Sequence, residues 1–187
     1  MKNVVRNVLF ISIFLITGHV NGTNTKEPEN GKLEITVSYE RQSGRGSNQY
    51  AVWIEDTEGK LIKTIFVTKF TADGGYSYRP NCVPLWLSKA TPASHTKKEI
   101  DAYSGATPST GEQIYIWDLT DNKGNKISQG EYTFFVEGTL INNSTVLYKG
   151  SFAVGKDKVS MTPTPDFNSD DPKNKGMIKS VTAKYIP

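Results

Sequence analysis

The sequence predicts an all-β protein, an antiparallel immunoglobulin-like β-sandwich of about seven strands with one long irregular insert. Two observations carry this prediction. Short segments in which apolar residues dominate or alternate with polar ones recur along the chain, and turn-forming residues separate them. The length of 187 residues, with nine Tyr, eight Phe and three Trp, fits one folded domain with enough bulky side chains for a core.

The first expected strand, residues 33–39, shows the alternation most clearly. Leu33, Ile35, Val37 and Tyr39 share one face, as expected for a strand with one buried side. The second and third expected strands form a hairpin, because a polar turn at 57–60 separates them. The further expected strands cover 50–56, 61–66, 113–119, 131–138, 145–154 and 177–186, the last of them reached through a polar loop at 163–175 in which no core segment is expected.

The N-terminus has the pattern of a secretory signal peptide. Lys2 and Arg6 precede an apolar run at 8–16, and cleavage is expected after Gly22. The run is too short for a typical membrane-spanning helix, although an uncleaved anchor is the alternative. We therefore expect a signal at 1–22, a polar leader at 23–31 and a β-sandwich domain at 32–187, exported to the periplasm.

Charge and composition exclude several classes of function. The signal contains two basic residues and no acidic one, so 22 basic and 19 acidic residues become 20 and 19 after cleavage. That balance does not suggest a nucleic-acid partner. One cysteine, Cys82, allows no intramolecular disulfide, and only His95 remains outside the signal, so a metal site is not expected. Cys82 fits an inert buried thiol better than a reactive one. Asn142 and Asn143 match glycosylation acceptors, which matter only in a eukaryotic host.

The insert, residues 68–112, does not follow the strand pattern. It contains Asp73-Gly74-Gly75 and Leu85-Trp86-Leu87, and residues 96–102 are expected to form a short helix. Long ordered loops in small domains usually carry function. The insert is therefore the first place to look for a site.

The segment from Trp117 to Tyr132 has a local signature. Trp117-Asp118, a turn at 121–124, Gly130 and Tyr132 occur in that order. The pattern resembles the immunoglobulin-like domain of bacterial flagellar hook-assembly proteins, and the resemblance implies the fold rather than flagellar work. Asp118 and Asp121 fit turn and strand-end positions better than a catalytic carboxylate pair.

The segment Asp101-Ala102-Tyr103-Ser104-Gly105-Ala106-Thr107 lies inside the insert. It resembles the acceptor motif of covalently flavinylated proteins. That resemblance implies that an FAD:protein FMN transferase joins the FMN phosphate to the Thr107 hydroxyl. Gly105 and Ala106 have almost no side chain, which would let the transferase approach the backbone closely, and Ser104 belongs to the same motif. Asp101 could help to place the donor, and the ordinary alternative is a plain turn before the next strand.

Residues 32–187 as a whole resemble an uncharacterised family of predicted bacterial periplasmic domains. The resemblance implies an FAD:protein FMN transferase and a membrane-bound flavin- or haem-linked reductase as partners. Trp86, Trp117 and Tyr103 are candidates to stack on the flavin, with a core position as the alternative for each.

Three functions remain open from the sequence. The first is an exported electron-transfer protein with covalent FMN on Thr107, which is a redox carrier and not an enzyme. The second is a cofactor-free structural or binding module of the cell envelope. The third is a hydrolase, for which Ser94-His95 is the only support.

Overall fold

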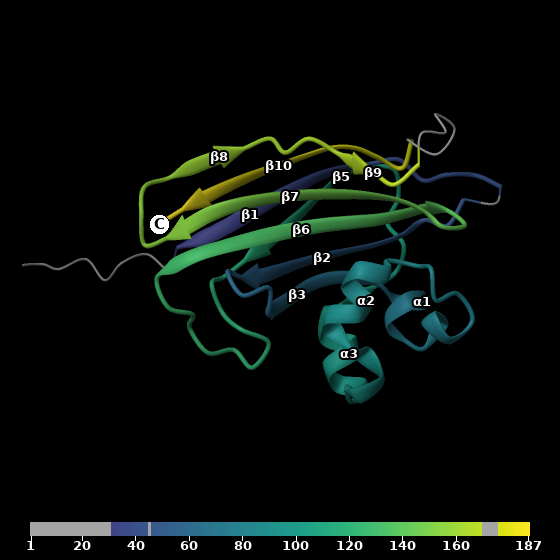
Figure 1. Cartoon of the computed structure of the whole chain (residues 1–187), viewed down its shortest axis with the longest axis horizontal. Helices are drawn as coiled ribbons and strands as arrows, with labels where there is room; N and C mark the ends of the chain where they lie inside the picture. The colour runs from purple at the N-terminus through teal and green to yellow at the C-terminus, as the bar shows by residue number, and fades with distance from the viewer. Residues whose placement is uncertain (1–30, 45, 170–175) are drawn as a thin grey trace, which may run out of the picture.

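The computed structural model describes residues 31–44, 46–169 and 176–187. It contains two β-sheets that pack face to face as a sandwich (Figure 1). The four-stranded sheet has the order β5 (Gly111–Trp117), β1 (Lys32–Tyr39), β10 (Ile178–Ile186), β8 (Val159–Met161). The six-stranded sheet has the order β4 (Ser104–Gly105), β3 (Leu61–Thr68), β2 (Gln49–Asp56), β6 (Gly130–Ile141), β7 (Ser144–Val154), β9 (Asp166–Phe167). The all-β sandwich is therefore confirmed. The expected signal peptide, and the leader apart from Gly31, lie outside the described residues.

The main core fills the space between the sheets. In β1, every second residue is buried from Leu33 to Tyr39, as the alternation predicts. On β5, Tyr115 and Trp117 point inward, while Ile114 and Ile116 lie on the exposed face. Both sheets thus contribute one apolar face to one continuous cluster.

The insert builds a second core on the outer face of the six-stranded sheet. Figure 1 shows its helices beside β2 and β3. Ala51, Trp53 and Val67 from the sheet pack there against Trp86 and Tyr103 from the helices. Because β2 is covered on both faces, its side chains are buried almost without interruption. The helical segments are α1 (Lys69–Ala72), η1 (Gly75–Ser77), α2 (Pro84–Ala90), η2 (Pro92–Ser94) and α3 (Lys97–Tyr103).

The short helix expected at 96–102 is present as α3, shifted by one residue. Thr96 is its N-cap rather than its first residue. The Thr96 hydroxyl accepts a hydrogen bond from the Glu99 backbone N–H, and the Glu99 carboxylate accepts one from the Thr96 backbone N–H at 2.7 Å. This reciprocal pair is a capping box, which fixes where the helix begins.

Three details of the expected strand pattern were wrong. The strand expected at 113–119 ends at Trp117, because Leu119 has a φ of +57°, which no extended strand accommodates. The sheet is not wholly antiparallel, since the two-residue strand β4 runs parallel to β3. The polar loop at 163–175 contains β9, whose Phe167 packs against the main core.

The Trp117–Tyr132 segment forms the turn and the core contact that its pattern predicts. Asp121 Oδ1 accepts hydrogen bonds from the backbone N–H groups of Lys123 and Asn125, at 2.8 and 2.9 Å. The Tyr132 ring packs edge-on against Trp117 at 5.7 Å, and its hydroxyl donates to the Ser128 carbonyl. A tyrosine tied to the backbone a few residues upstream is a recurring feature of immunoglobulin-type sandwiches.

Trp53→Ala should lower the free energy of unfolding by about 3–5 kcal/mol, measured by denaturant titration. Trp53 is fully buried and stacks on Phe135 at 5.0 Å. Its indole N–H also donates to the buried Glu55 carboxylate at 2.7 Å, so truncation removes a partner as well as volume. A loss below about 1 kcal/mol would show that the second core contributes little to stability.

Candidate functional site

The flavin-acceptor-like segment joins α3 to β5. Asp101 and Ala102 lie exposed in the last turn of α3, and Tyr103, the final helical residue, is buried. β4 then pairs in parallel with the end of β3, with Ser104 opposite Val67 and Gly105 opposite Thr68. The sheet therefore holds the middle of the segment, and the chain leaves it at Ala106 and Thr107.

The Phe66 ring packs so closely on Gly105 that this position requires a glycine. A Cβ atom at this position would lie 2.7 Å from the Phe66 ring, closer than side chains normally come. The neighbouring Ser104 hydroxyl is buried and has no hydrogen-bond partner among the described residues. From the sequence, the small residues were interpreted as giving the transferase access to the backbone. The structure adds a second reason for glycine at position 105, which is its packing against Phe66.

Thr107 is half-buried in the loop that follows β4. Within the described part of the chain, its hydroxyl makes no hydrogen bond, whereas the Thr110 hydroxyl accepts one from the Arg41 backbone N–H at 3.0 Å. Ser109 and Thr110 are both exposed. No hydrogen bond therefore ties the Thr107 oxygen to another described residue.

Asp101 lies in a network of ion pairs that ties α3 to α1. Its Oδ1 lies 3.0 Å from Lys97 Nζ and 3.7 Å from Lys69 Nζ. Lys97 also pairs with Asp73 at 2.9 Å. The hydrogen bond from Lys97 and the nearby lysine charges lower the pKa of Asp101, so this carboxylate is ionised at neutral pH. The sequence named Asp101 but not the two lysines beside it.

The three aromatic candidates occupy core positions. Trp86 is fully buried, and Tyr103 lies edge-on to it at 6.1 Å in the second core. Trp117 is 1% exposed in the main core, and its indole N–H donates to the Thr120 carbonyl. Neither indole ring offers a free face, so the core alternative describes both tryptophans. Tyr103 also lines a surface pocket.

Two exposed aromatic side chains lie in the α1–η1 part of the insert and were missed from the sequence. Phe70 on α1 is 44% exposed, and Tyr78 after η1 is 86% exposed. Together with Lys69, Asp73 and Ser77 they line a shallow groove of about 530 Å³. Their exposure depends on how the insert folds, and no periodic pattern in the sequence predicts it.

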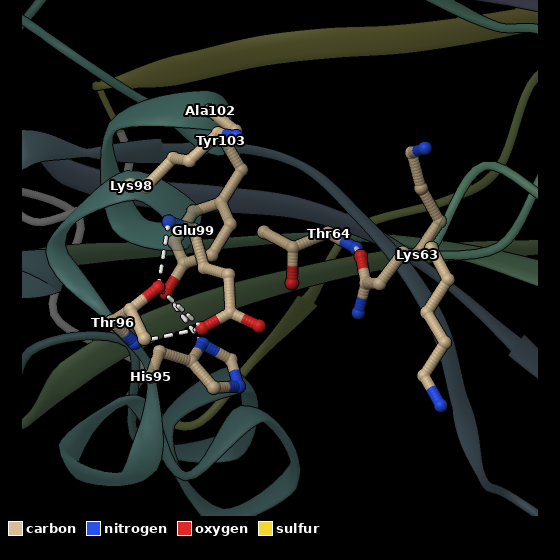
Figure 2. A pocket seen from close by; sticks show the side chains of 10 residues that line it. Lys63, Thr64, His95, Thr96, Lys98, Glu99, Ala102 and Tyr103 are labelled. Carbon is tan, nitrogen blue, oxygen red and sulfur yellow. Dashed lines mark hydrogen bonds between the residues drawn. The ribbon is translucent and has the colours of Figure 1, made fainter.

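A second pocket, of about 590 Å³, lies between α3 and β3. Figure 2 shows His95, Thr96, Glu99 and Tyr103 on one side of it and Lys63 and Thr64 on the other. The Tyr103 hydroxyl lies 2.8 Å from His95 Nδ1, and burial raises the pKa of Tyr103 to about 12. Lys63 is held by Thr120 and Asp121, so this pocket has a fixed, polar wall.

The other residues that the sequence singled out make ordinary structural contacts or lie in exposed turns. The Ser94 hydroxyl donates to the Thr91 carbonyl at 2.9 Å, while His95 contacts Tyr103, so the two do not form a nucleophile–base pair. Cys82 is fully buried with Ser47 Oγ at 3.4 Å from its sulfur. Asn142 and Asn143 are exposed in the turn between β6 and β7.

A buried carboxylate on β6, which the sequence did not single out, positions α2. Glu137 is 3% exposed and accepts hydrogen bonds from the backbone N–H groups of Leu85 and Trp86, at 3.0 and 2.9 Å. These are orphan donors of the first helical turn. Burial raises the pKa of Glu137 to about 7, against the lowering effect of the two hydrogen bonds. This carboxylate anchors the insert to the sheet.

Comparison with known proteins gives one result. Residues 32–167 match the family described as predicted periplasmic protein (DUF2271). No curated protein and no solved structure matches the chain. In the described residues, no helix is both long and apolar enough to cross a membrane, and no three His, Cys, Asp or Glu side chains are grouped as metal ligands.

Proposed function

Because the chain belongs to the DUF2271 family of predicted periplasmic proteins, we propose a function that suits an exported protein. It carries FMN, attached through a phosphoester to Thr107, and transfers electrons outside the cytoplasmic membrane. The observation that carries the proposal is the Thr107 hydroxyl itself. It follows a sheet-anchored segment of acceptor type and makes no hydrogen bond to the described residues.

The attachment needs a transferase that uses FAD. The Thr107 oxygen bonds to the FMN phosphorus, AMP leaves from the pyrophosphate, and the hydroxyl proton passes to solvent. A transferase must reach this loop with a bulky donor. Ala106 is exposed and Thr107 half-buried, which leaves the loop open to such an approach.

Charged residues at the same corner suit a phosphodiester. Lys69 begins α1 directly after Thr68, which is the sheet partner of Gly105. Lys69 and Lys97 both pair with Asp101, and Lys97 also pairs with Asp73, so the two lysines and two carboxylates balance one another. Lys69 makes the longer of the two pairs with Asp101, at 3.7 Å, and its ammonium group is a suitable partner for the single negative charge of a phosphodiester.

The flavin supplies the redox chemistry, while the protein supplies the tether and the surface around it. A covalent bond suits a protein outside the cytosol, where a dissociating cofactor would be lost. A membrane-bound flavin- or haem-linked reductase is the proposed source of electrons.

A second function, a cofactor-free binding module of the envelope, is favoured by one feature of the four-stranded sheet. β5 is an edge strand of that sheet, and Ile114 and Ile116 on it are 59% and 56% exposed. An apolar edge of this kind can pair with another chain.

Absorbance after denaturation separates the two functions. Protein purified from a host that contains its transferase should keep a flavin band at about 450 nm after acid precipitation and washing, because the phosphoester is covalent. Protein from a host without the transferase is the control and should lack the band. Colourless protein from both hosts would favour the envelope module.

A further inference from the structure

We propose that the isoalloxazine ring of the attached FMN lies in the groove between α1 and η1, against Tyr78 and Phe70. This inference rests on the proposed attachment at Thr107. It assigns a place to the ring that neither the acceptor-like segment nor the family supplies.

The groove and Thr107 leave the six-stranded sheet at the same corner. Thr68 ends β3 and Gly105 ends β4, and these two residues are paired. Phe70 and Thr107 each follow two residues later, a distance of at most about 7 Å along either chain. Cα atoms of α1 also lie within 8 Å of those of β4. A ribityl phosphate on Thr107 therefore starts next to the groove.

The groove has the surface that a planar aromatic ring needs. Tyr78 and Phe70 are two of the four large hydrophobic side chains that are exposed in the described part of the chain. Both line the same groove of about 530 Å³. Aromatic faces that remain in water gain from contact with another ring. Two such side chains in one groove fit a flavin better than a polar ligand.

The Phe70 side of the groove is fixed by close packing. Gly75 packs so closely on Phe70 that a Cβ atom there would lie 2.2 Å from the Phe70 carbonyl oxygen and 2.7 Å from its ring. Gly74 has a φ of +92°, which a glycine adopts without strain. The Lys97–Asp73 and Lys69–Asp101 ion pairs then link the groove to α3 and to the acceptor-like segment.

The pocket in Figure 2 is the competing place for the ring, because Ala102 and Tyr103 of the acceptor-like segment line it. Both residues precede β4, however, whereas Thr107 follows it. Lys63 and Thr64 line the pocket from the first half of β3, whereas β4 pairs with the last two residues of that strand. Its lining includes four charged residues, Lys63, Lys98, Lys123 and Glu99, and the Tyr103 ring that also lines it is buried. The groove instead offers two exposed aromatic side chains, Phe70 and Tyr78, for contact with the ring system.

Flavin fluorescence tests the position of the ring. A phenol in contact with an excited flavin donates an electron to it and quenches emission. Tyr78→Ala should therefore raise the fluorescence per attached flavin several-fold in the folded protein, with intact mass used to count the flavin. Tyr78→Phe keeps a stacking face but removes the phenol, and should also raise the emission. Phe70→Ala tests the second ring.

Lys123→Ala is the matched control, since it changes the wall of the other pocket and should leave the emission unchanged. Emission of the wild type equal to that of free FMN, or unchanged by Tyr78→Ala, would overturn the inference while the attachment stands. A rise in Tyr103→Phe instead would place the ring in the other pocket, which the Tyr103 phenol lines. If the wild type carries no flavin at all, the proposed function fails first.

Discussion

Thr107→Ala should abolish covalent attachment of FMN during co-expression with a competent transferase. The substitution removes the oxygen that bonds to phosphorus, and no other atom of the side chain can replace it. Thr107→Ser should keep the attachment, because it keeps the hydroxyl. Asp101→Asn should slow the attachment without preventing it, since the acceptor remains. Flavin fluorescence of the denatured protein in a gel measures all three.

Thr110→Ala is the control, because this hydroxyl accepts a backbone hydrogen bond and lies three residues beyond the proposed acceptor. Its attachment should match that of the wild type. The Thr107→Ala protein should remain folded, with a change in the free energy of unfolding of no more than about 0.5 kcal/mol, since the hydroxyl has no hydrogen-bond partner among the described residues. A persistent adduct in Thr107→Ala would move the acceptor to Ser109 or Thr110.

Glu137→Ala should destabilise the protein by about 2–5 kcal/mol. The change leaves the backbone N–H groups of Leu85 and Trp86 without their acceptor in a buried place. It also opens a space beneath α2, which is the helix that carries Trp86 into the second core. Chemical unfolding of the variant beside the wild type measures the loss.

The pH dependence of stability gives a sharper test of Glu137. Its pKa is about 7 in the folded protein and 4.5 as the ordinary value, so the folded state binds the extra proton between these pH values. The contribution of Glu137 to stability is therefore full below pH 4.5 and is lost as the pH rises through 7. Relative to Glu137→Gln, the wild type should lose up to about 3 kcal/mol between pH 4 and pH 8. Parallel pH profiles for the two proteins would contradict the assignment.

The strands were predictable because their signals are local. The alternation from Leu33 to Tyr39 reports one buried face, and the structure buries those side chains. The helix at 97–103 was predictable for a similar reason, since Thr96 and Glu99 are a capping pair within one turn. The turn at Asp121 likewise depends on residues two and four positions later.

The arrangement of the insert was not predictable, because its contacts are distant in sequence. Glu137 contacts the α2 backbone across more than fifty residues, and nothing near it in the sequence marks it as a helix anchor. The pairing of β4 with β3 depends on two residues only. Trp86 and Trp117 were candidates for flavin stacking because large aromatics suit that role, and only the fold shows that both are enclosed. Tyr78 and Phe70 were missed because nothing in the sequence marks these aromatic side chains as exposed, and only the fold shows that they are.

Intact-mass measurement of the exported protein tests the central claim most directly. Protein purified from a host that contains its native transferase should be heavier than the unmodified mature chain by about 438 Da, the mass of FMN less one water. Peptide mapping should place the added mass on the peptide that contains Thr107. An unmodified mass under these conditions, with the transferase shown to be active on another substrate, would contradict the account.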